Sequence, residues 1–355
     1  MIHILGLLLC IIISSLAGCS GAVDAPSSEG FNAILITDIG GLGDKGFNDS
    51  GWAGCQIAQK QIREQGGEID VQFIESEEQT DYSANLNMAA ERADVVVALG
   101  FLIADAVDKV ASYNPGAHFI LVDAVVHQDN VAGIIFRANE GAFLAGLLAS
   151  YVSQTGTVAV MPGMDIPPVD SFAVGYRAGA LTGGALQDKE MTILSTTIGS
   201  FDDPVKAKSI AVSLMDQKAD IILQLAGNSG LGVIEAVKDA PGRAFAIGVD
   251  IDQDDLAPGK ILTSILKRMD RIVAREIVAA YNREFQGGLS NVGLKEDAVG
   301  LSDMRHTRQF VPEEAFSVMD QAKKRIIEGK LEVPRLYEEL DSFDAQSAAD
   351  LLKSS

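Results

Sequence analysis

The side chains that could do chemistry in this sequence stand mostly just beyond short apolar runs. Asp38, Asp123 and Asp250 each follow a run rich in Val, Ile or Leu, and Lys267 follows another. Such runs predict strands, and in open α/β sheets ligands bind beyond the carboxyl ends of the strands. The full set offers carboxylates, an amine, an amide, a glycine and two aromatic rings: Asp38, Phe47, Asn48, Asp123, Phe201, Gly227, Asp250 and Lys267. These groups suit a polar aromatic ligand that is held by hydrogen bonds and stacking.

A purely structural role is the alternative for each of these residues, because Asp and Gly also end strands and cap helices. At any single position that explanation is as good as a binding role. The concentration of such residues at many expected strand ends favours a shared cleft.

Short apolar runs alternate with amphipathic stretches from Phe31 onward. The runs predict ten strands, at 33–37, 71–74, 95–99, 119–122, 133–136, 158–161, 192–195, 221–225, 245–249 and 261–264. The stretches predict nine helices, at 51–64, 83–90, 104–112, 141–153, 169–182, 205–217, 230–238, 268–285 and 313–328. Runs of Val and Ile without strict alternation suit parallel sheets that are buried on both faces. The pattern predicts an α/β fold with right-handed βαβ crossovers.

The number of expected strands and the length of 355 residues favour two lobes over one wide sheet. We expect two doubly wound parallel sheets joined by a hinge. The first α/β lobe takes residues 31–136 plus about 265–303, and the second takes 137–264 plus about 304–335. The C-terminal tail, 336–355, has an amphipathic, acidic stretch that we expect to form a solvated surface helix.

The N-terminus has the pattern of an export signal. Residues 4–16 are mostly apolar and shorter than a typical membrane span, and Leu16-Ala17-Gly18 leads into Cys19. Small residues before a cysteine resemble the lipobox of bacterial lipoproteins. We therefore expect a lipoprotein signal peptide at 1–18, acylation of Cys19 with chains such as palmitate, and a flexible tether at 19–30. The segment before the apolar run lacks Lys and Arg, which departs from this pattern.

The segment Gly41-Leu42-Gly43-Asp44-Lys45-Gly46 matches the G-x-G-x-x-G pattern of dinucleotide-binding enzymes and follows an expected strand. Glu75, at the end of the next strand, would then hold a ribose. Three points oppose this hypothesis. The helix is expected to begin only after Phe47-Asn48, Asp44 would place negative charge beside a pyrophosphate, and an exported chain lacks ready access to NAD.

Composition narrows the remaining classes of function. The net charge of -21 opposes binding of nucleic acid through a basic patch. The four histidines are scattered without metal-ligand spacing, and the three cysteines cannot form a disulfide framework. We expect no metal site, no cofactor and no catalysis, although cleft aspartates acting as an acid–base pair keep an exported enzyme as an alternative.

Six segments resemble the basic membrane protein family of substrate-binding lipoproteins, in the order that the family has them. They are TDIGGLGDKGFN at 37–48, EGAFLAG at 140–146, GSFDDP at 199–204, AGNSG at 226–230, GVDIDQ at 248–253 and LTSILK at 262–267. The resemblance spans most of the chain after the tether, and it implies a type I periplasmic-binding-protein fold. Gly46 departs from the common form, because many relatives have Ser before the residue that corresponds to Phe47.

The resemblance also implies a ligand and its contacts. The family includes a receptor for purine nucleosides, so Phe47 and Phe201 are expected to sandwich a base. Hydrogen bonds around the base are expected from Asp38, Asn48 and Asp123. The ribose is expected to contact Gly227, Asp250 and Lys267.

The expected function is therefore capture of a nucleoside, with a purine nucleoside favoured, by a monomer for an ABC transporter permease. The protein would be anchored by lipid on the extracytoplasmic face of a cell membrane. Capture would proceed by closure of the two lobes on the ligand. A ligand sensor or a receptor for another solute is the alternative within the binding class.

Overall fold

The computed structural model describes residues 30–353, and these residues form two six-stranded sheets. The expected signal peptide (1–18), the acylation site Cys19 and nearly all of the tether (19–30) lie outside the described residues. No helix in the described part of the chain is long and apolar enough to cross a membrane.

The first sheet has the strand order β11-β5-β4-β3-β1-β2, and its neighbouring strands all pair in parallel. Its strands are β1 (Phe31–Ile36), β2 (Ile69–Ile74), β3 (Val95–Leu99), β4 (His118–Val122), β5 (Val131–Phe136) and β11 (Gly288–Val292). Its helices are α1 (Phe47–Glu64), α2 (Tyr82–Ala90), α3 (Ala104–Tyr113) and α8 (Met269–Tyr281), with a 3-10 turn at Gln79–Asp81. This sheet and these helices are the first lobe.

The second sheet has the order β12-β10-β9-β8-β6-β7 and is parallel except for the antiparallel pair of β10 and β12. Its strands are β6 (Thr157–Pro162), β7 (Thr192–Ser195), β8 (Ile221–Leu225), β9 (Phe245–Asp250), β10 (Ile261–Lys267) and β12 (Val299–Leu301). Its helices are α4 (Ala138–Val152), α5 (Pro167–Leu186), α6 (Pro204–Asp216), α7 (Ser229–Asp239), α9 (Glu313–Ile327), α10 (Tyr337–Asp341) and α11 (Ala345–Lys353). Two 3-10 turns, Asp254–Leu256 and Arg308–Phe310, complete this second lobe.

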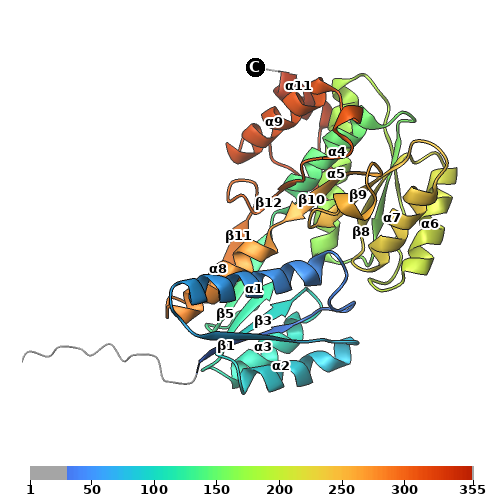
Figure 1. The fold of residues 1–355 in the computed structure, drawn as a ribbon. Helices are drawn as coiled ribbons and strands as arrows, with labels where there is room; N and C mark the ends of the chain where they lie inside the picture. Colours follow the sequence, from blue (N-terminus) through green and yellow to red (C-terminus); the bar gives the residue numbers. More distant parts are fainter. Residues whose placement is uncertain (1–29, 354–355) are drawn as a thin grey trace, which may run out of the picture. The chain divides into compact units, whose positions relative to one another are not determined.

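Both faces of each sheet are buried, which explains the continuous apolar runs in the sequence. Helices α1 and α8 cover one face of the first sheet, and α2 and α3 cover the other (Figure 1). In β1, Ala33 and Leu35 belong to the apolar cluster on the side of α1 and α8, whereas Ile34 and Ile36 belong to the cluster with α2 and α3. Side chains alternate between faces along a strand, so a strand covered on both sides needs apolar residues at every position.

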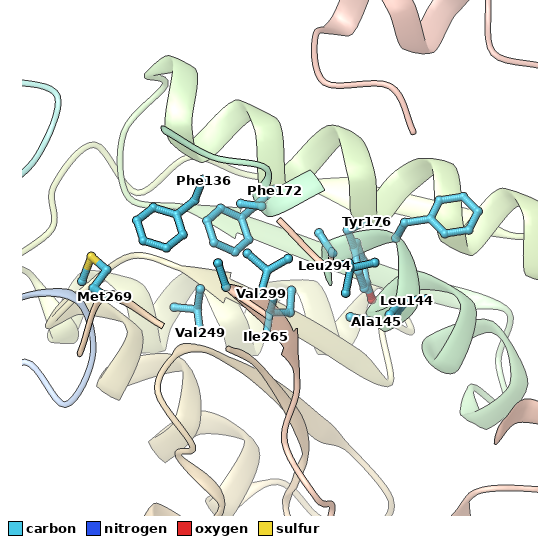
Figure 2. Close-up of a cluster of buried hydrophobic side chains, with 14 of the residues drawn as sticks. Phe136, Leu144, Ala145, Phe172, Tyr176, Val249, Ile265, Met269, Leu294 and Val299 are labelled. Atoms are coloured by element: carbon cyan, nitrogen blue, oxygen red, sulfur yellow. The ribbon is translucent and has the colours of Figure 1, made fainter. Parts of the chain in front are cut away.

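The chain passes between the lobes three times, at 136–138, 267–269 and 292–299, and we call these segments the hinge. Apolar residues pack where the hinge segments lie, and Figure 2 shows Phe136, Phe172, Val249, Met269 and Val299 among them. The strand pairing differs from the boundaries expected at 265 and 303. The end of β10 and all of β12 belong to the second sheet, because β12 pairs with Ile265–Lys267.

The sequence led us to expect a solvated surface helix in the C-terminal tail. In the structure, one face of this helix is buried. Ala348, Ala349 and Leu352 of α11 are buried, and α11 packs against α5 and α9 of the second lobe. Its polar residues face solvent, which is why the segment looks acidic and exposed in the sequence.

Candidate functional site

A cavity lies where strands of both sheets reach their carboxyl ends. All eight residues that we expected to bind ligand line it: Asp38, Phe47, Asn48, Asp123, Phe201, Gly227, Asp250 and Lys267. The first lobe contributes the ends of β1, β3 and β4 and the start of α1. The second lobe contributes the ends of β8, β9 and β10 and the loop after β7. The polar residues at strand ends, dispersed in the sequence, thus meet in one place.

Asp38 follows β1 and is held by three contacts from its own lobe. Its Oδ1 accepts hydrogen bonds from the hydroxyl of Tyr82 and from the N–H of Ile39, the latter at 2.8 Å. Its own N–H donates to Oδ1 of Asn48 at 2.9 Å. Burial raises the pKa of the Asp38 carboxyl to about 6, against the lowering effect of the Tyr82 and Ile39 hydrogen bonds.

Asn48 has most of its hydrogen-bonding capacity committed within the protein. While its Oδ1 accepts from Asp38, its Nδ2 donates to Asp44 at 3.2 Å. The side-chain amide has two N–H donors, so one of them remains for a ligand. Asn48 therefore orders the start of α1 as well as lining the cavity.

Asp44 caps α1 with its side chain. Its carboxylate accepts from the N–H groups of Gly46 at 2.9 Å, Asn48 at 2.8 Å and Asp49 at 3.2 Å. The helix begins at Phe47, four residues before the expected start at Gly51. The position where a pyrophosphate would need free N–H groups at a helix N-terminus is therefore filled by the protein's own carboxylate. This geometry opposes a dinucleotide site at the G-x-G-x-x-G segment.

Lys267 and Asp123 form a buried ion pair between the lobes. Lys267 ends β10 of the second sheet, Asp123 follows β4 of the first, and their side chains are 2% and 8% exposed. The Lys267 ammonium also lies 4.8 Å from the ring centroid of Phe47 and 5.1 Å from that of Phe136. A cation over aromatic faces is stabilised by the ring quadrupole, so Lys267 helps to orient Phe47.

Asp250 ends β9 and is buried without a hydrogen-bond donor. The residue is 8% exposed, and none of the hydrogen bonds found within residues 30–353 has its carboxylate as acceptor. Burial raises the pKa of the Asp250 carboxyl to about 7, Lys267 lowers it, and the neighbouring Asp44 and Asp123 raise it further. A buried carboxylate of this kind gains most from a ligand that brings its own donors.

Phe201 rests against a glycine of the neighbouring strand end. A Cβ at Gly163 would lie 2.6 Å from Cε1 of Phe201, closer than real side chains come, so the ring needs glycine there. The carbonyl of Phe201 accepts from the N–H of Ser229 at 2.9 Å. Gly227, with a φ of +53°, turns the chain close beside it. The second lobe thereby offers one aromatic face whose position is set by backbone contacts.

Sequence reasoning missed the apolar wall of the cavity. The start of α5 supplies Ile166, Pro168, Val169 and Phe172, and the loop after β3 supplies Phe101. Apolar residues at the start of a helix are typical of a core, so no signal in the sequence separates them from packing residues. Across residues 30–353, no cluster of His, Cys, Asp and Glu has the geometry to hold a metal ion.

Two lobes with a lined cavity at their strand ends define a class of protein, the two-lobed solute-binding proteins. A solved solute-binding protein of an ABC transporter from Aeropyrum pernix has this fold, with a TM-score of 0.80 and 28% identity over 90% of this chain and 98% of that one. Another from Conexibacter woesei matches at a TM-score of 0.66 and 21% identity, over 86% of this chain and 99% of that one. The type I periplasmic-binding-protein fold expected from the sequence is confirmed.

Residues 31–337 match the family model described as ABC transporter substrate-binding protein PnrA-like, and the chain belongs to this family, Bmp. Basic membrane protein A of Borreliella burgdorferi is 32% identical, over 95% of this chain and 98% of that protein. A lipoprotein of Pyrococcus furiosus is 30% identical, over 93% of this chain and 87% of that protein. The resemblance drawn from the six motifs is thus confirmed, and the protein is a substrate-binding protein of an ABC transporter.

Proposed function

We propose that this protein captures a nucleoside, with a purine nucleoside favoured, between its two lobes and delivers it to an ABC permease. The observation that carries the proposal is that two aromatic rings and a carboxylate line the same cavity. An aromatic ring comes from each lobe, Phe47 and Phe201, and Asp250, whose largely buried carboxylate accepts no hydrogen bond from residues 30–353, lies in the same lining. A base offers a flat aromatic face, and its sugar offers hydroxyl donors.

The individual contacts follow from the types of group present. Stacking of a base on an aromatic side chain contributes about 1–3 kcal/mol. Ribose hydroxyls would donate to Asp250 and accept from Lys267, and the N–H left on Asn48 and the carboxylates of Asp38 and Asp123 would meet the edge of the base. Gly227 would let the backbone approach the sugar closely.

Capture would work through closure of the lobes. A ligand that contacts both lobes stabilises the closed arrangement, and the permease would then recognise that arrangement. We also propose that Cys19 carries the lipid anchor that holds a monomer on the extracytoplasmic face of a cell membrane. Relatives that are named lipoproteins support this anchor.

The proposal is tested by a thermal-shift screen of the chain from Ser20 onward, which retains the whole compact unit 31–355. The protein is unfolded and refolded first, so that carried-over ligand is removed. Nucleosides, free bases, sugars and amino acids are then compared. We expect a concentration-dependent rise in melting temperature with purine nucleosides, because a ligand that binds only the folded state stabilises it.

Variants test whether the rise in melting temperature depends on residues of the cavity. Phe47→Ala and Asp250→Asn should lose most of the nucleoside-dependent rise. Phe73→Ala removes a ring that is 44% exposed and lies outside the cavity lining, and Asp129→Asn neutralises an exposed carboxylate, so both should keep the rise. A shift with sugars or amino acids and none with any nucleoside would retain the binding class and reject the proposed ligand.

A further inference from the structure

The two oxygens of the Asp38 carboxylate have different surroundings. Oδ1 accepts from the Tyr82 hydroxyl and from the N–H of Ile39. Oδ2 lies against Gly100, whose missing side chain leaves room for it, and no donor within residues 30–353 reaches it. Both Asp38 and Gly100 line the cavity. Oδ2 is therefore the oxygen that remains for a ligand.

Tyr82 acts on this carboxylate from behind the cavity. It is the first residue of α2, is 2% exposed and is not part of the cavity lining. Burial and the neighbouring Asp38 raise the pKa of the Tyr82 phenol well above its usual range, so the hydroxyl keeps its proton. In this position the hydroxyl can only be the donor to Asp38.

We propose that Tyr82 is a positioning residue that holds Asp38 with Oδ2 as a dedicated acceptor, so that the site selects nucleosides whose base presents a ring N–H. A 6-oxopurine nucleoside such as inosine has this N–H, whereas adenosine presents a bare ring nitrogen at the same position. The inference rests on the proposed nucleoside function and adds which base edge the site prefers.

The protonation of Asp38 makes the preference depend on pH. Its carboxyl has a pKa of about 6, and the charged groups that affect it are Asp123 after β4 and Asp44 ahead of α1. Because Oδ1 already accepts two hydrogen bonds, the proton that binds at low pH goes to Oδ2. Asp38 then becomes a donor there, which suits the bare ring nitrogen of adenosine and opposes the N–H of inosine.

The experiment measures the dissociation constants of inosine and adenosine by calorimetry between about pH 5 and about pH 8, on the chain from Ser20 onward. The ratio of the two constants is the readout, since both ligands carry the same ribose and effects at Asp250 cancel. Inosine needs the ionised carboxylate and adenosine the protonated carboxyl, so we expect the preference for inosine to fall about tenfold for each unit by which the pH is lowered through the pKa of Asp38. In Asp38→Asn, the ratio should no longer depend on pH.

Tyr82→Phe tests the positioning role of the hydroxyl, because it removes the donor to Asp38 and keeps the buried ring. The lost hydrogen bond should raise the pKa of Asp38, so the pH at which inosine and adenosine bind equally tightly should move upward. Tyr113→Phe, at a residue that is 76% exposed, should leave it unchanged. In the unmutated protein, 1-methylinosine, which lacks the ring N–H, should bind at least tenfold more weakly than inosine, and this comparison does not depend on any variant folding.

Tight binding of inosine with a ratio that does not change with pH, or equal binding of 1-methylinosine, would overturn the inference while leaving the proposed function in place. If the pH of equal binding did not shift in folded Tyr82→Phe, the role of Tyr82 would be overturned. If no nucleoside bound at any pH, the proposed function would fail, and this inference would fail with it.

Discussion

Asp250 links the chemistry of the cavity to the stability of the protein. Its pKa is raised to about 7, mainly by burial, so the folded state holds this proton more tightly than the unfolded chain does. Between the unfolded pKa of about 4 and the folded pKa, the folded state binds more protons than the unfolded state. Stability of the ligand-free protein therefore decreases as pH rises through this window.

The corresponding prediction concerns thermal unfolding of the ligand-free protein from about pH 4.5 to about pH 7.5 at constant ionic strength. The melting temperature should fall with rising pH, and Asp250→Asn should reduce this slope because the amide does not titrate. Asp38, whose pKa is also raised, should leave a smaller slope in the variant. Equal slopes in the two proteins would show that Asp250 is not the source.

Individual residues of the cavity differ in how well the sequence predicted them. Asp38 and Asp123 lie just beyond strand ends and Asp250 is the last residue of a strand, so their positions, taken together with the other polar residues at strand ends, favoured a shared cleft. Tyr82 was not predicted, because it is the first residue of a helix and does not line the cavity. It contacts the site only by its hydrogen bond to Asp38. Gly163 was missed for a similar reason, since its importance depends on a ring that is distant in sequence.

At the scale of elements, α1 depends on the cap that Asp44 provides. Asp44→Ala removes an acceptor from three N–H groups at the helix start, and the loss of such a cap costs about 1–2 kcal/mol. We expect chemical denaturation to show a loss of this size, together with weaker nucleoside binding because Phe47 is the first helical residue. Glu64→Ala, at an exposed site in the last turn of the same helix, should be close to neutral. Unchanged stability would mean that water replaces the cap.

Most elements could be predicted, because burial on both faces leaves long apolar runs. Each of the ten expected strands overlaps one of β1 to β10, and each of the nine expected helices overlaps an observed one. The strand β11 has no such run, since its residues Gly288–Asn291 are exposed or half-buried at the sheet edge. The strand β12 has only three residues, Val299–Leu301, too few for a pattern. Each is held by backbone pairing with a buried apolar strand, β11 with β5 and β12 with β10.

At the scale of the whole molecule, Gln253 connects the lobes independently of any ligand. Its Nε2 donates to the carbonyl of Lys45 at 2.7 Å, from the second lobe to the loop ahead of α1. Its Oε1 accepts from Nε2 of Gln224 at 3.0 Å and from the N–H of Val249 at 3.3 Å. The side chain is 2% exposed, so these bonds are shielded from water. Gln253 thus ties the loop just before Phe47 to the segment just after Asp250.

Gln253→Met keeps the length of this side chain and removes its hydrogen bond to Lys45, which joins the lobes, together with the two bonds that Oε1 accepts within the second lobe. Of these bonds, only the one to Lys45 joins the lobes, and one hydrogen bond contributes about 1 kcal/mol, so ligand release should accelerate about fivefold with little change in the association rate, as stopped-flow measurements would show. The two bonds lost within the second lobe should lower its stability, which chemical denaturation measures separately. The compaction that a nucleoside is expected to induce should also be smaller in this variant, as X-ray scattering with and without ligand would measure. Gln65→Leu, at an exposed position, serves as the control. A slower association rate with unchanged release would contradict a role in holding the lobes closed.

The threefold passage of the chain through the hinge also affects the order in which the molecule can fold. Residues 31–136 supply five strands of the first sheet, but α8 and β11, which cover α1 and pair with β5, come only after the second lobe's main strands. Loops that join such distant segments close slowly. During synthesis, residues 31–136 therefore keep apolar surface exposed until α8 and β11 have been made. The first lobe begins to form first, but it is complete only after most of the second lobe has been synthesised.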